Sequence, residues 1–159
     1  VCGHILTEHH RSDSPAPVPT DFSAELFFAD GVSASLYCSF RTANEQWAHV
    51  SGSEGSLYIP DFVRPHFGSE VAFDVSKPIF HVRGCDFNME QHTRRVAVSE
   101  YSNSHENSQE ANMFRRFAEL ALSGKPDPHW GQIALETQQV LDACLRSARS
   151  AGRAIELST

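Results

Sequence analysis

Features that the sequence lacks exclude several classes of protein. No apolar run in its 159 residues approaches the ~20 residues that a bilayer-spanning helix needs. The first eleven residues hold three histidines and a glutamate where a signal peptide would be apolar. Basic residues are also scarce, with 13 Lys and Arg against 20 Asp and Glu and a net charge of −7, which argues against binding along a nucleic-acid backbone. We therefore expect a cytoplasmic protein with neither membrane nor nucleic acid as a partner.

The four cysteines lack any C-x-x-C pair, the spacing that would indicate a metal or redox motif. Cys38 and Cys144 fall on the apolar sides of an expected strand and an expected helix, where a thiol acts as a small hydrophobe. A reduced, intracellular setting fits this pattern, although the spacing alone leaves a disulfide open.

The last third of the chain predicts two helices and a short final strand. Asn107 and Glu110 suit a capping box at the start of the first helix, and Gly124 suits its left-handed end. Asp127 followed by Pro128 is typical of a second helix start. Apolar residues then recur at helical spacing in both segments. They are Met113, Phe114, Phe117, Ala118 and Ala121 in the first, and Trp130, Ile133, Ala134, Leu141, Cys144, Leu145 and Ala148 in the second. Gly152 ends the second helix, and 154–157 is the expected strand.

Residues 22–40 predict a β-hairpin, because apolar and polar residues alternate on both sides of Asp30-Gly31. A two-residue loop would place the two apolar sets on opposite faces of the sheet. A three-residue loop of Ala29, Asp30 and Gly31 pairs Phe28 with Val32 and keeps the sets together, so we expect this turn with Gly31 left-handed.

Further strands are expected at 1–7, 46–51, 56–59, 71–75, 79–82 and 95–99, while 87–93 reads as either strand or loop. Strands followed by helices indicate an α+β fold. We expect one domain: a large, mostly antiparallel, open-faced β-sheet with helices packed on one face.

The second face of the 22–40 hairpin carries serines with scattered aromatic residues. Such a face is typical of a wetted surface, a cleft lining or a subunit contact. We take Glu25, Phe27 and Tyr37 as candidates for a homo-oligomer contact, with a plain solvent face as the alternative.

Several segments in matching order resemble one protein family. They are the hairpin around Asp30-Gly31, the turn Gly52-Ser53-Glu54-Gly55-Ser56-Leu57, the helix end Ser123-Gly124-Lys125-Pro126, the run Val140-Leu141-Asp142-Ala143 with Ser147-Ala148, and the closing Ala154-Ile155-Glu156-Leu157. Together they are similar to the C-terminal domain of the Gfo/Idh/MocA (glucose–fructose oxidoreductase, inositol dehydrogenase, rhizopine catabolism) family. The stretch from 66 to 104 contributes nothing to this resemblance.

The resemblance implies a dihydrodipicolinate-reductase-like domain from a two-domain enzyme. Members bind NAD or NADP in an N-terminal Rossmann domain and move hydride to or from a sugar or cyclitol. The C-terminal sheet covers the substrate and supports oligomerisation.

The chain has no G-x-G-x-x-G, which the pyrophosphate cradle requires. It also lacks the family's Glu-Lys-Pro and its Asp–His pair four residues apart. We therefore expect no catalytic residue, cofactor site or activity in this chain by itself, with the Rossmann domain preceding Val1 in an active parent.

Candidate substrate contacts cluster after the hairpin. Arg41 and Asn44 can donate hydrogen bonds to hydroxyl groups, and Trp47 offers an aromatic plane, a combination typical of sugar pockets. Arg64 and His66 are further candidates on the following loop. The alternative is a solvated loop with Trp47 packed at its base.

Other chemistry finds less support. His4, Glu8 and His10 share a strand face, but His4 and Glu8 lie ~13 Å apart on a straight strand, too far for one ion. No nucleophile-elbow motif indicates a hydrolase. We expect no metal site.

Overall fold

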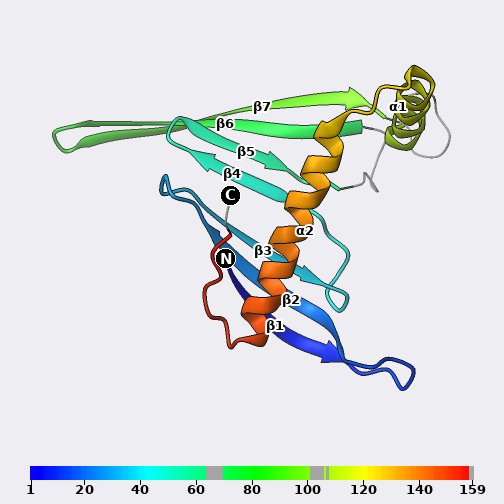
Figure 1. Cartoon of the computed structure of the whole chain (residues 1–159). Helices are drawn as coiled ribbons and strands as arrows, with labels where there is room; N and C mark the ends of the chain where they lie inside the picture. Colours follow the sequence, from blue (N-terminus) through cyan, green and yellow to red (C-terminus); the bar gives the residue numbers. More distant parts are fainter. Residues whose placement is uncertain (64–69, 101–105, 107, 158–159) are drawn as a thin grey trace. The chain divides into compact units, whose positions relative to one another are not determined.

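The computed structural model describes residues 1–63, 70–100, 106 and 108–157 (Figure 1). It is an α+β structure with two antiparallel sheets, of three and four strands, and two helices. The fold class expected from the sequence is therefore confirmed, although the strands form two sheets instead of one large sheet. The chain divides into two compact units, Val1–Ala43 with Asp127–Thr159, and Asn44–Pro126.

The first unit contains the three-stranded sheet, in the order β1 (Cys2–His9), β2 (Val18–Phe27) and β3 (Ser33–Ser39). Its β2–β3 hairpin has the register that the alternation predicted, with Phe27 opposite Ser33. Phe28 N donates to Val32 O over 2.9 Å, and Gly31 has a φ of 82°. The three-residue turn is confirmed, because only this loop length keeps the apolar residues of both strands on one face.

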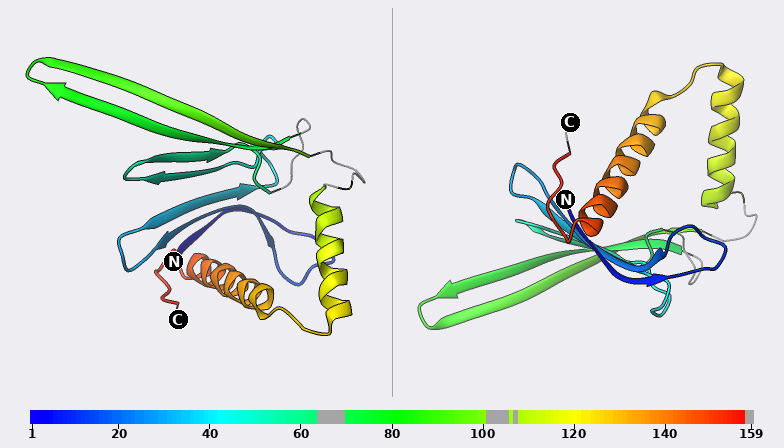
Figure 2. Two further views of the ribbon diagram at one scale, coloured as in Figure 1. Left: turned by 90° about the horizontal axis from the view of Figure 1, so that it is seen from above. Right: turned by 60° about the horizontal axis from the view of Figure 1, so that its bottom comes forward.

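The helix α2 (Pro128–Arg149) begins as predicted, with Asp127 as N-cap and Pro128 at its first position. It packs against β1 within the first unit (Figure 2). Its buried residues are Ala143, Cys144 and Ser147. Trp130, Ile133 and Leu141 are exposed, so only the C-terminal half of the predicted apolar stripe is covered.

Close approach between α2 and β1 depends on Gly3. A Cβ atom at this position would lie 2.3 Å from the carbonyl oxygen of Cys144 and 3.0 Å from the ring of Phe22. Gly3 N also donates to Ser147 Oγ over 2.9 Å, and that hydroxyl donates to the carbonyl of Arg153 over 2.6 Å. Helix, edge strand and C-terminal segment are thus joined through one serine.

The C-terminal segment differs from its prediction. Residues 153–157 form no strand. Ile155 instead exchanges two hydrogen bonds with Val1, from Ile155 N to Val1 O over 2.9 Å and from Val1 N to Ile155 O over 2.8 Å. The helix itself ends at Arg149 with Ser150 as C-cap, and Gly152, at a φ of 76°, follows it. A single pair of hydrogen bonds is too little backbone pairing to make this segment a strand.

The second unit contains the four-stranded sheet, in the order β4 (Ala48–Gly52), β5 (Gly55–Ile59), β6 (Glu70–Arg83) and β7 (Asp86–Ser99). The two strands expected at 71–75 and 79–82 are one continuous strand, and the ambiguous 87–93 belongs to β7. β6 and β7 pair along their full length around a two-residue turn, Gly84-Cys85. β5 pairs with β6 only at residues 74–76, so most of this ribbon extends past its neighbour (Figure 2).

The helix α1 (Gln109–Ser123) also lies in the second unit. Ser108, not Asn107, is its N-cap and accepts a bond from Ala111 N over 3.2 Å; Asn107 lies outside the described residues. The buried Glu100 accepts a further bond from Gln109 N over 2.9 Å, which suits the positive end of a helix. Gly124 ends the helix at a φ of 63°, as predicted.

No residue of α1 is buried, and its apolar stripe of Met113, Phe114 and Phe117 is exposed. The expectation that both helices pack on one sheet face is therefore wrong for α1. Among the described residues, no helix combines the length and apolar composition that crossing a membrane requires.

Candidate functional site

A buried carboxylate lies at one end of the three-stranded sheet. Register places Thr7 opposite Asp21 and Asp21 opposite Ser39, so one side chain from each strand falls in a row. A β-bulge at Thr7 permits this alignment, since the β1–β2 register shifts on both sides of that residue. Such bulges re-aim side chains locally.

Three hydroxyl groups lie around the Asp21 carboxylate. The hydroxyls of Thr7 and Ser39 each donate to one of its oxygens. Thr20 Oγ1 lies 3.3 Å from Oδ2 and 2.9 Å from Thr7 Oγ1. Hydroxyl donors offset the cost of burying a polar side chain, so the cluster holds the Asp21 side chain in place.

Arg41, the first predicted substrate residue, lies at the margin of this cluster. Its Nη1 atom is 3.7 Å from Asp21 Oδ2, and its side chain is largely exposed. The backbone N–H groups of Arg41 and Thr42 donate to Ser39 Oγ over 2.9 and 3.2 Å. Ser39 thus fixes the turn after β3, while most of the guanidinium donors of Arg41 face solvent.

The predicted residues Asn44 and Trp47 belong to the second unit, before β4. Both are exposed. The Trp47 ring lies 6.4 Å from that of Tyr58 at an interplanar angle of 37°, and Tyr58 also lies 6.4 Å from His49. His49 and Tyr58 are directly opposite in the β4–β5 pair. The three rings make an aromatic surface in the second unit, and Trp47 is not packed away at the base of a loop.

The other candidates fall in different places. Arg64 and His66 lie outside the described residues. Glu25, Phe27 and Tyr37 lie on the second face of the β2–β3 hairpin with Asp21 and Ser39, since Ser23 is opposite Tyr37 and Glu25 is opposite Ser35. All three are exposed, as a contact surface between subunits requires. Arg41 belongs to the first unit, and Asn44 and Trp47 to the second.

Asp21 and Thr7 are not among the site residues predicted from the sequence. The signal was an aspartate at the start of an alternating strand, where it shares a face with Ser23 and Glu25. Its burial was not foreseeable, because it depends on a bulge that brings Thr7 alongside.

All four cysteines lie within the described residues and are free thiols. Cys144 is buried, as expected, and desolvation raises the pKa of its thiol. Cys38 is exposed, so its expected packing in the core is wrong. Within residues 1–63, 70–100, 106 and 108–157, no three His, Cys, Asp or Glu side chains lie close enough together to hold a metal ion.

No model of a known protein family matches this chain.

Proposed function

We propose that this chain is the substrate-covering and assembly part of an NAD(P)-dependent oxidoreductase that acts on a sugar, cyclitol or related hydroxy compound. The observation that carries the proposal is the ordered set of segments that resembles the Gfo/Idh/MocA family, from the hairpin around Asp30-Gly31 to the closing residues 154–157. The antiparallel hairpin with its three-residue turn and the tight Gly52–Gly55 connection are consistent with it. The glycine loop and the catalytic residues belong, in this proposal, to the rest of the enzyme.

Substrate contact is assigned to the polar and aromatic groups that follow the hairpin. Trp47 and Tyr58 offer apolar ring faces, and the C–H face of a sugar ring packs well on such surfaces. Asn44, in the same unit, supplies donors for hydroxyl oxygens, and Arg41, which belongs to the first unit, stays a separate candidate. Arg64 and His66 stay as further candidates for the same role.

Tryptophan fluorescence tests this assignment directly. In a Trp130→Phe background Trp47 is the sole indole, so titration with a panel of sugars and cyclitols should change its emission saturably in the millimolar range. Asn44→Ala should weaken that response, whereas Gln132→Ala on the exposed face of α2 should leave it unchanged. A flat response to every hydroxy compound would count against substrate contact here.

The cofactor assignment has its own test. The isolated chain should not alter the fluorescence of NADH or NADPH, and a saturable micromolar signal would refute the assignment of the nucleotide site to another domain. Reading the coding sequence upstream of Val1 is decisive. A strand–G-x-G-x-x-G–helix segment followed by Glu-Lys-Pro is the expected result.

A second candidate is a sheet-based binding or assembly module without redox activity. The exposed Phe27 and Tyr37 on one face of the first sheet favour it, since such aromatic side chains are enriched at interfaces. Both candidates predict a homo-oligomer through this face. A monomeric mass in light scattering at tens of micromolar would contradict that shared expectation, and the upstream coding sequence separates the two candidates.

A further inference from the structure

The outer part of the β6–β7 ribbon forms an arm with one apolar and one polar face. We call residues 77–92 the arm, because β5 pairs with β6 no further than Ser76. Phe80 is directly opposite Met89, and Val82 is directly opposite Phe87. Opposite residues share a face, so these four apolar side chains lie together. The other face carries Lys77, Ile79, His81, Arg83, Asp86, Asn88, Glu90 and His92.

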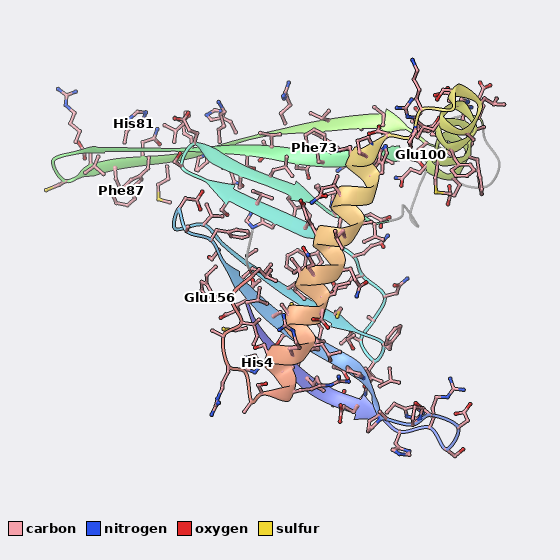
Figure 3. The ribbon with its side chains drawn as sticks, in the orientation of Figure 1. His4, Phe73, His81, Phe87, Glu100 and Glu156 are labelled. Carbon is pink, nitrogen blue, oxygen red and sulfur yellow. The ribbon has the colours of Figure 1, made fainter. Side chains whose placement is uncertain are left out.

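Figure 3 shows this division at the two labelled residues of the arm, since His81 and Phe87 project from opposite sides of the ribbon. The face that is apolar in the arm becomes polar in the part of the ribbon beside β5. Where β6 and β7 lie beside β5, the face that continues toward Phe80 and Met89 carries Asp74, Ser76, Thr93 and Arg95. Ser76 Oγ and Thr93 Oγ1 are 2.7 Å apart there, and Arg95 bonds Glu70. The apolar residues of the arm therefore form a separate patch with a polar border.

This patch is open to solvent. Phe80, Val82, Phe87 and Met89 are 62%, 63%, 70% and 71% exposed. A two-stranded ribbon alone is marginally stable in water, so an arm of this length needs a surface against its apolar face. We propose that the apolar face of the arm packs on the same face of the arm of a second copy of this chain, in a two-fold symmetric dimer.

The distribution of charge permits a second copy as the occupant of this face. The chain carries a net charge of −7, which opposes self-association at most surfaces. The apolar face of the arm, from Pro78 to Gln91, contains no ionisable side chain. Identical copies can approach there without placing like charges opposite one another. Ser76 and Thr93 supply the polar rim that borders the apolar centre of most interfaces.

The available area is near the lower limit for such a contact. Each of the four side chains offers about 100 Å² or more of exposed surface, judged from the area that large side chains bury. Two arms together then remove about 800 Å² or more from solvent, which approaches the ~1,000 Å² of a specific interface and suits a weak, concentration-dependent dimer. Pro78 lies just beyond the last β5–β6 pair and has no N–H to donate, which disfavours addition of a strand to the β6 edge of the arm. Addition of a strand at the outer edge of β7 would leave the four apolar side chains exposed, so only face-to-face packing covers them.

The test is a matched pair of double variants in the full chain. Phe80→Thr with Met89→Thr removes a cross-strand pair from the apolar face while keeping strand-forming residues. His81→Thr with Asn88→Thr changes the next cross-strand pair, on the opposite face. Sedimentation should give a dimer for the unaltered chain, a dissociation constant raised about 30-fold or more in the first variant, and a change below about twofold in the control.

Hydrogen exchange provides a second measurement that needs no variant. Amides of residues 77–92 should be better protected at ~100 μM than at ~1 μM chain, whereas those of 48–59 should not change. A chain that stays monomeric at ~100 μM, or an unchanged dimer in the Phe80/Met89 variant, would overturn the proposal. Binding of the monomer to lipid vesicles through Phe87 would do so as well.

A third variant separates this inference from the proposed function. Phe27→Thr with Tyr37→Thr alters the open face of the first sheet. If that variant dissociates the dimer and the arm variant does not, the arm proposal fails while assembly through the first sheet stands. If only the arm variant dissociates the assembly, the arm contact stands and the contact through the first sheet fails. If each of the two variants lowers the mass of an assembly larger than a dimer, both contacts stand.

Discussion

The helices α1 and α2 both begin after a polar N-cap and differ in their surroundings. Each has a polar N-cap, Ser108 in α1 and Asp127 in α2, and each carries a predicted apolar stripe. Yet α2 buries Ala143, Cys144 and Ser147, while α1 buries no residue. The buried apolar residues described divide unevenly too, with Ala24, Ala143 and Cys144 in the first unit and Ala72 in the second. An apolar stripe sets which face of a helix can pack, and small residues set how closely it packs.

The largest effect is expected from a substitution at Gly3, where α2 packs on β1. Gly3→Val would drive its side chain into the backbone of Cys144, so we expect a loss of about 3 kcal/mol in the free energy of unfolding. Gly131→Ala is the control, because nothing lies within 4 Å of the added Cβ and alanine favours a helix by about 0.5–1 kcal/mol. Urea titration followed by circular dichroism measures both. Equal stabilities for the two variants would show that α2 does not approach β1 this closely.

Ser147 is the next most sensitive position. Ser147→Ala leaves Gly3 N and the Arg153 carbonyl without their partner, at an expected cost of about 2 kcal/mol. Ser150→Ala removes a hydroxyl at the helix end and should cost under about 0.5 kcal/mol. The same urea titration applies. A neutral Ser147→Ala would mean that solvent satisfies both groups.

Asp21 tests the far end of the same sheet. Asp21→Asn replaces an acceptor that takes charge-assisted bonds from Thr7 and Ser39, so we expect a loss of about 1.5 kcal/mol. Asp13→Asn is the control, since its partner Arg11 is exposed and exposed ion pairs contribute little. Thermal unfolding should separate the two variants. Equal unfolding midpoints for the two variants would show that the Asp21 carboxylate does not stabilise the sheet.

The smallest effect is expected in α1. Phe117→Ser on its exposed stripe should change the free energy of unfolding by less than about 0.5 kcal/mol, because no covering surface is lost. Ser108→Ala, at the N-cap of the same helix, should cost about 1 kcal/mol and serves as the positive control. A loss above about 1.5 kcal/mol for Phe117→Ser would show that this stripe is covered after all.

The sequence alone determined the features that depend on neighbouring residues. The three-residue turn followed from the alternation of residues 22–40, because a one-residue slip would invert one strand. Gly124 and the Asp127-Pro128 pair marked helix boundaries because their backbone preferences are local. Among the predicted site residues, Arg41 and Asn44 are exposed, as residues of a polar connection usually are, whereas the exposure of Trp47 was not predicted.

Only the tertiary structure decided the features that join distant residues. Residues 79–82 and 87–93 belong to one long β-ribbon because they pair with each other across the two strands, and this pairing cannot be predicted from either segment alone. The burial of Asp21 required Thr7 and Ser39 from two other strands. The C-terminal segment forms no strand and is held by one pair of hydrogen bonds between Ile155 and Val1. A local pattern states what a segment can form, and the partners that long-range packing supplies decide which of its faces is covered.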